Sequence, residues 1–294
     1  MIVENLLEKI GFSAEMQEDY LKYRAIADER IFECAKEYLD HKMTMYEAKE
    51  KLDAMGIKNM SIFTVYLLFV LECTDWLKDK YLQNGRNDEM FITAMRDILF
   101  KTNECKERFG VFGIEAFTWY NGFFSMGRFA TTRLQFDKSL WYEETIKLSN
   151  YTVKPGDLVF RCHIPSDGPL TYEKRLASYK ELYNFYKDEL KDGILIIHCD
   201  SWILYREYIE KVYKETSNIV DFSKDFEMYG ARKYDSFINC WRVFYKDFEG
   251  DTSVLPQKTS MQKAFVKYLN NPDANHGTGK GFILFDGEKI LTRK

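Results

Sequence analysis

Residues 158–170 read LVFRCHIPSDGPL, and residues 194–204 read ILIIHCDSWIL. Each segment opens with a short run of apolar residues, which is typical of a buried strand. Residues 171–190, between them, have the composition of a helix that is too long for a hairpin connection. This order of strand, helix and strand predicts two parallel, neighbouring strands in an α/β domain.

A histidine closes each of the two predicted strands. His163 ends the first and His198 ends the second, so both are expected at the sheet edge where α/β domains bind ligands. Because side chains alternate along a strand, Arg161 shares a face with His163, and Asp200 shares a face with His198. A lone histidine is more often a buried imidazole bonded to the backbone. Two at equivalent strand ends favour a catalytic role.

The turn PSDGP (165–169) leads from His163 into the predicted helix. A helix N-terminus carries N–H groups without helical partners and a partial positive charge, and a Ser/Gly turn lets an anion approach both. We interpret this turn as a candidate phosphate cradle. The alternative is an ordinary turn with helix capping.

Other side chains near the histidines raise different mechanisms. Cys162 is expected in the core, because neighbouring strand residues point to opposite faces. Ser201 is a candidate hydroxyl beside the histidines, although it lacks the glycines of a nucleophile elbow. No metal site is predicted, because the one cluster of ligand residues, His198, Cys199 and Asp200, is consecutive along a strand.

The chain divides into two differently built parts. All five prolines lie after residue 150. Before that point, apolar residues recur at helical spacing and predict helices near 14–42, 44–55, 59–83 and 87–109. We therefore expect an all-helical N-terminal domain at 1–116 and a mixed-sheet domain at 117–294. The fold class is α/β (α+β).

In the second part, short β-type runs alternate with helical ones. The predicted strands are 133–140, 158–164, 194–199, 218–228, 237–245 and 281–286, and the predicted helices are 171–190, 205–215 and 260–269. Residues 275–281, NHGTGKG, hint at a phosphate loop but precede a strand, so we interpret them as a flexible turn. His41 and His276 are expected at the surface.

The composition of the chain limits the classes of partner that it is expected to bind. A net charge of -4, with 42 basic and 46 acidic residues mixed along the chain, provides no basic stripe for nucleic acid. The apolar run 62–71 is shorter than the roughly 20 residues that cross a bilayer. The first residues lack the features of a signal peptide, and the six cysteines form no CxxC pair. A cytoplasmic protein with reduced thiols and no membrane partner is expected; its oligomeric state is not predicted.

Segments spread over about half the chain carry a family resemblance. They are GRFATTRLQF (127–136), FRCHIPSDGPL (160–170), IIHCDSWIL (196–204), SNIVDF (217–222) and LPQKTSMQKAFVKYL (255–269). With them the chain resembles the bacterial acyltransferase-domain family that has a helical N-acyltransferase N-terminal domain and a GNAT-like C-terminal domain.

The resemblance implies a GNAT-like fold in which the strand ending at His163 is the central acyl-CoA-binding strand. Coenzyme A would be the co-substrate, with no metal. Its pyrophosphate would lie on the turn and the helix N-terminus, with the binding residues Ile164, Ser166, Asp167, Gly168 and Leu170. The family signature of Gln or Arg, two residues, Gly, one residue and Gly or Ala is absent before this helix. A carrier-protein thioester as donor therefore stays open.

The leading hypothesis is acyl transfer from a thioester, with acyl-CoA as donor, to an amine or hydroxyl of a small-molecule or peptide acceptor. His163 or His198 would be the general base. The other histidine, or Ser201, would assist the leaving thiolate or position the acceptor. The alternative is a non-catalytic GNAT-like ligand-binding or sensor module, which the missing glycines favour. A third hypothesis is a hydrolase that uses Cys199 or Ser201 with His198.

Overall fold

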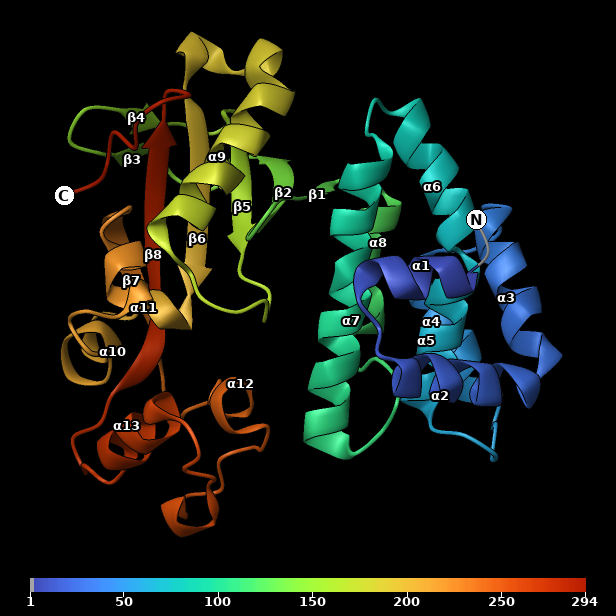
Figure 1. The fold of residues 1–294 in the computed structure, drawn as a ribbon. Helices are drawn as coiled ribbons and strands as arrows, with labels where there is room; N and C mark the ends of the chain where they lie inside the picture. The colour runs from blue at the N-terminus through green and yellow to red at the C-terminus, as the bar shows by residue number, and fades with distance from the viewer. Residues whose placement is uncertain (1–2) are drawn as a thin grey trace. The chain divides into compact units, whose positions relative to one another are not determined.

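The structure, a computed structural model, describes residues 3–294 and divides into two compact units (Figure 1). The first unit runs to Ala130 and the second from Thr131 to Lys294. The first is helical up to β1 (Arg128–Ala130), and the second contains a mixed sheet with helices. The expected fold class is confirmed.

Helices build the first unit. They are α1 (Val3–Ile10), α2 (Ala14–Ala25), α3 (Glu29–Leu39), α4 (Met45–Ala54), α5 (Ile62–Glu72), α6 (Thr74–Gln83), α7 (Asp88–Phe109), the short 3-10 helix η1 (Phe117–Tyr120) and α8 (Asn121–Phe124). The spans predicted near 14–42 and 59–83 each contain two helices. Asp28 starts the second helix of the earlier span, because its side chain accepts a hydrogen bond from the Arg30 N–H.

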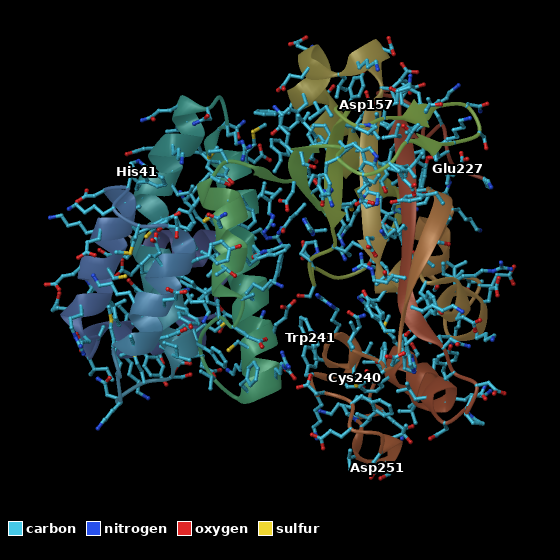
Figure 2. The ribbon with its side chains drawn as sticks, turned by 180° about the vertical axis from the view of Figure 1, so that it is seen from behind. His41, Asp157, Glu227, Cys240, Trp241 and Asp251 are labelled. Carbon is cyan, nitrogen blue, oxygen red and sulfur yellow. The ribbon has the colours of Figure 1, made fainter. Side chains whose placement is uncertain are left out.

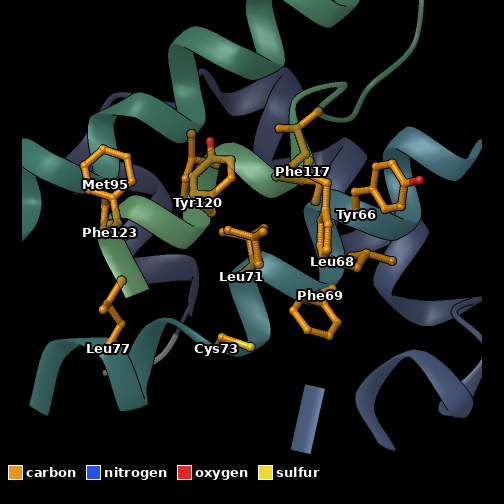
Figure 3. Close-up of a cluster of buried hydrophobic side chains, with 14 of the residues drawn as sticks. Tyr66, Leu68, Phe69, Leu71, Cys73, Leu77, Met95, Phe117, Tyr120 and Phe123 are labelled. Atoms are coloured by element: carbon orange, nitrogen blue, oxygen red, sulfur yellow. The ribbon is translucent and has the colours of Figure 1, made fainter. Parts of the chain in front are cut away.

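Helix α5 contributes Tyr66, Leu68, Phe69 and Leu71 to the buried core of this unit (Figure 3). Nearly all its side chains are buried, as expected for a helix that is apolar on every side. The Phe117 ring centroid lies 4.7 Å from that of Tyr66 and 5.1 Å from that of Phe69. Phe123 is also buried in this core. These aromatic residues belong to the helical core, so the chain divides after Ala130, later than the boundary expected at 116/117.

The second unit is built on a sheet whose strands follow the order β2-β5-β6-β8-β7. Its strands are β2 (Gln135–Leu140), β5 (Leu158–His163), β6 (Leu195–Ser201), β7 (Glu227–Tyr234) and β8 (His276–Phe285), and a separate hairpin contains β3 (Ile146–Lys147) and β4 (Thr152–Val153). Strands β5 and β6 pair in parallel, as predicted. The pairs β2·β5, β6·β8 and β7·β8 are antiparallel.

The helices of this unit are α9 (Tyr172–Tyr186), α10 (Arg206–Lys211), α11 (Asn218–Ser223), α12 (Cys240–Phe244) and α13 (Ser260–Leu269), with the 3-10 turns η2 (Lys187–Glu189), η3 (Lys191–Gly193), η4 (Trp202–Leu204) and η5 (Thr252–Val254). The strand predicted at 218–228 is wrong for most of its length, because Ser217 caps a helix there and β7 begins only at Glu227. The strand predicted at 237–245 is also wrong. The buried residues Cys240, Val243 and Phe244 recur at helical spacing.

The glycine-rich segment predicted as a flexible turn at 275–281 is, from His276 onward, the first part of β8. A side chain at Gly277 would place its Cβ 2.2 Å from the Arg232 carbonyl oxygen, so the strand needs glycine where another backbone comes this close. His276, expected at the surface, is partly buried. Its Nδ1 lies 3.1 Å from the Tyr208 hydroxyl, and its ring stacks on Phe237.

Different layers cover the two faces of the sheet. Helix α9 lies across one face (Figure 1), where the ring centroids of Tyr186 and Phe160 are 4.8 Å apart. The β3–β4 hairpin packs on the other face, in a cluster with Trp141. Glu227, labelled in Figure 2, accepts hydrogen bonds from the N–H and hydroxyl of Ser149, at 2.7 and 2.9 Å, and so ties this hairpin to β7.

A buried ion cluster joins α9 to α11 and to the C-terminal residues. The fully buried Arg175 guanidinium donates to Asp225 and to Asp221, each at 2.8 Å. Arg293 pairs with the same two carboxylates, and the Tyr179 hydroxyl donates to Asp225 at 3.1 Å. Because Arg175 and Asp225 are both fully buried, each of these two charges depends on its partners.

We expect Asp225→Ala to lower the free energy of unfolding by about 3–5 kcal/mol, because it leaves the buried Arg175 charge without its buried partner. Urea unfolding followed by circular dichroism measures this. The control is Glu210→Ala, which removes an exposed pair with Arg206 and should leave the unfolding midpoint nearly unchanged. Equal midpoints for the two variants would contradict a stabilising role for this cluster.

Candidate functional site

The carboxyl ends of β5 and β6 bring His163 and His198 to one face of the sheet. The parallel register pairs Arg161 with His198. His163 is two residues further along β5 and therefore falls level with Asp200 on the same face. Cys162 points to the opposite face and is buried.

His163 is held by a carboxylate that the sequence did not reveal. Its Nε2 lies 2.8 Å from Oδ2 of Asp137, and both side chains are 30% exposed. Asp137 lies on β2 opposite Arg161, so it reaches His163 diagonally across the antiparallel pair. A carboxylate at Nε2 favours the tautomer with the proton on that nitrogen, and Nδ1 then carries the lone pair. His163 is therefore an oriented imidazole that remains partly accessible to solvent.

His198 has a different environment. It is 3% exposed, and its ring lies within 6 Å, centroid to centroid, of the rings of Trp141, Tyr229 and Phe282. Burial, assisted by the charge of Arg161, lowers the pKa of His198 to about 4. Its Nε2 lies 2.9 Å from the Tyr229 hydroxyl. This histidine is neutral at pH 7 and enclosed, so it is suited to support the site more than to collect a proton.

The turn after His163 continues into α9. Gly168 has φ +73°, in the left-handed region that favours glycine. The Asp167 N–H donates to the Pro165 carbonyl at 2.9 Å, and Pro169 has no N–H, so fewer backbone donors remain for a ligand than the sequence suggested. Thr171 precedes α9 without capping it through its side chain.

Comparison with known proteins decides the family. Residues 128–283 match the GNAT-like C-terminal domain, and residues 1–126 match the N-acyltransferase N-terminal domain. The chain belongs to the GNAT-like C-terminal domain family. The resemblance found in the sequence is confirmed.

Solved structures share this two-part fold. An acyltransferase in complex with decanoyl-CoA and teicoplanin is 17% identical, with a TM-score of 0.71 over 95% of this chain and 86% of that chain. An acyltransferase in complex with CoA and 10C-teicoplanin is 16% identical, with a TM-score of 0.69 over the same shares. A mutant acyltransferase in complex with octanoyl-CoA is 16% identical, with a TM-score of 0.70, again over 95% and 86%. At such identities the likeness shows the fold. No curated protein matches the chain.

The GNAT-like domain does not bring Ser201 to the histidines. Ser201 pairs with Gly279 at the end of β6, and alternation places it on the face opposite His198. Cys199 shares that opposite face, where its contact with Cys162 and its burial raise its pKa well above the ordinary thiol value. A hydrolase that uses either residue with His198 lacks the required contact.

Charged side chains gather near His198 in the GNAT-like domain. Asp200 Oδ2 lies 3.7 Å from a guanidinium nitrogen of Arg232 and 4.0 Å from Nζ of Lys280. Glu143 Oε2 lies 3.8 Å from the same Lys280 nitrogen. The sequence did not predict this group, because its members come from β6, β7, β8 and the segment after β2.

Residues 3–294 contain no group of three or more His, Cys, Asp or Glu side chains that could hold a metal ion. Over the same residues, none of the helices is both long and apolar enough to span a membrane.

We expect His198 to make stability pH-dependent. Its pKa is about 4 in the folded protein and about 6.5 in the unfolded chain. Above pH 6.5 the imidazole is neutral in both states, so its burial does not lower the free energy of unfolding. Below that pH the unfolded chain takes up a proton that the folded protein does not, and about 2 kcal/mol is lost by pH 5. Unfolding free energies of the wild type and His198→Asn at pH 7.5 and 5 measure this. Equal losses on acidification in both proteins would contradict it.

Proposed function

We propose that this chain is an acyltransferase that moves an acyl group from acyl-CoA to an amine or hydroxyl of a small-molecule acceptor. Family membership supports acyl transfer, since the first part of the chain matches an N-acyltransferase N-terminal domain and the second a GNAT-like C-terminal domain. The structurally similar acyltransferases bind decanoyl-CoA, octanoyl-CoA or CoA, and two of them are complexed with teicoplanin or its 10C form. A peptide-like acceptor such as a glycopeptide is therefore the first to test.

The observation that carries the proposal is the His163–Asp137 pair at the carboxyl end of β5. With Asp137 2.8 Å from Nε2, the His163 imidazole is oriented to accept a proton from the acceptor at Nδ1. The deprotonated nitrogen or oxygen attacks the thioester carbonyl. The C–S bond breaks as the C–N or C–O bond completes, and the thiolate takes up a proton from the imidazolium or from water.

The turn and the start of α9 fit the phosphates of a CoA donor. A helix N-terminus attracts anions, and Gly168 lets the chain turn tightly before it. Asp167, which would repel phosphate, lies where its charge interacts with the buried Arg133 guanidinium. This offsets the most unfavourable feature of the turn. When bound, acyl-CoA supplies the activated acyl group.

His198 and Tyr229 are proposed to support this site. The buried pair adjoins the carboxyl end of β6, next to Asp200. Burial raises the pKa of Tyr229, with the charges of Glu143 and Asp200 acting in the same direction, so its hydroxyl keeps its proton at neutral pH. A protonated phenol beside a neutral imidazole gives one rigid side of the site, and neither group changes its ionisation state near neutral pH.

The second candidate is a non-catalytic GNAT-like module that binds or senses an acyl or nucleotide-like ligand. The missing glycine signature favours it. The two candidates differ in turnover but not in binding. Retained acyl-CoA with no thiol release for any acceptor would support the sensor.

The proposed location is the cytoplasm. All six cysteines are free and buried, which suits a compartment that keeps thiols reduced. Acyl-CoA esters would be the donors there.

We expect His163→Ala to lower the turnover number by about a hundredfold to ten-thousandfold, because the general base is lost. Release of CoA thiol from decanoyl-CoA, with teicoplanin as first acceptor, measures turnover. Asp137→Asn should lower turnover in the same direction. The matched control is Cys162→Ala, next in the strand but facing the core, which should retain turnover. Full turnover in folded His163→Ala protein would exclude His163 as the base.

We expect Gly168→Val to weaken acyl-CoA binding, because a β-branched residue is strained at φ +73° and distorts the turn. The shift of the unfolding temperature with decanoyl-CoA measures binding. The control is Gly156→Val, which has the same kind of strain at φ +93° but lies at the opposite end of β5. Equal ligand-induced shifts in both variants would place the phosphates elsewhere.

A further inference from the structure

Arg133 lies beneath the turn that follows His163. Its side chain is almost fully buried, with 4% of the residue exposed. The guanidinium donates to three backbone carbonyls of the turn, those of Gly168 at 2.8 Å, Pro165 at 3.0 Å and Pro169 at 3.4 Å. The turn is therefore organised around one buried cation.

Backbone and side-chain contacts fix Arg133 itself to α9. Its N–H donates to the Ser178 hydroxyl at 2.9 Å. The N–H of Thr132 donates to the Glu181 carboxylate at 2.9 Å, and the Thr132 hydroxyl donates to the same carboxylate. The helix that begins after the turn thus also holds the arginine that shapes the turn.

Peptide geometry shows what this does to the N–H groups. In a trans peptide the C=O and the following N–H point in opposite directions, and residues 3–294 contain no cis peptide. Because the carbonyls of Pro165 and Pro169 point at Arg133, the N–H groups of Ser166 and Leu170 point away from it. Without this cation, carbonyl oxygens could turn toward a bound anion and repel it.

A second buried arginine holds the backbone carbonyl of the next residue along the chain. Arg175 Nη1 donates to the Leu170 carbonyl at 2.5 Å. The N–H of Thr171, on the other side of that peptide, therefore points away from Arg175. Arg175 also belongs to the ion cluster with Asp221 and Asp225, so its removal affects stability. The Arg133 guanidinium donates to backbone carbonyls and does not belong to that ion cluster, so Arg133 is the better residue to test.

We propose that Arg133 is a positioning residue for the donor site, which holds the 165–169 turn with its carbonyls inward so that backbone N–H groups meet the pyrophosphate of acyl-CoA. This rests on the proposed function. In the family signature, glycines let the backbone approach the phosphates. Here a buried guanidinium pre-orders a turn that contains two prolines and only one glycine.

The test compares Arg133→Met with the wild type, using decanoyl-CoA and decanoyl-pantetheine as calorimetric probes. The second probe has the same acyl chain but no phosphate. We expect Arg133→Met to weaken decanoyl-CoA binding by about tenfold or more, and to leave decanoyl-pantetheine binding within about twofold. The control is Arg206→Met, an exposed arginine of α10, which should change neither affinity.

Each outcome either supports or overturns the proposed role of Arg133. Equal losses of affinity for both probes would indicate a merely structural role and overturn the inference. Unchanged affinity of the variant for decanoyl-CoA would also overturn it. If the wild type binds neither probe, the proposed donor fails and the role of Arg133 fails with it. Should Arg133→Met not fold, Arg133→Lys takes its place. Lysine keeps the charge but cannot reach three carbonyls at once, so it should weaken decanoyl-CoA binding selectively.

Discussion

The parallel pairing of β5 with β6 is the contact on which the site depends. Its register places Arg161 beside His198, and alternation then assigns every neighbouring side chain to a face. His163 and Asp200 fall on the face with His198, while Cys162 goes to the face that α9 covers. A shift of one residue would exchange the faces and send the histidines into the core under α9.

Two histidines on one face have different properties because their surroundings differ. Asp137 holds His163 where about a third of the side chain remains exposed. Aromatic rings enclose His198, and burial keeps it neutral. Exposure and a carboxylate partner suit a base that exchanges protons with substrate, whereas a dry aromatic environment suits a residue that keeps one ionisation state. The fold thus gives different surroundings to two histidines that the sequence did not distinguish.

Buried cations organise the turn between β5 and α9. Arg133 and Arg175 bind backbone carbonyls of residues 165–170, before α9 begins, and Arg175 is fixed by Asp221 and Asp225. Buried guanidinium groups are retained only where their hydrogen bonds are satisfied, so these contacts also restrict the conformations of the turn. An ordered turn loses less entropy when it meets a ligand.

The sequence by itself determined the helical first part, the strand–helix–strand order and the histidines at two strand ends, because these follow from local periodicity and turn residues. It also carried the family resemblance. Tertiary structure alone decided that Asp137 meets His163, since that contact depends on the antiparallel register of a distant strand. It likewise made residues 276–281 part of a strand and 237–245 partly a helix, because sheet pairing and burial outweigh the local sequence pattern there. Ser201 lies on the face opposite His198 for the same reason, because only the pairing of the sheet sets which face a strand residue occupies.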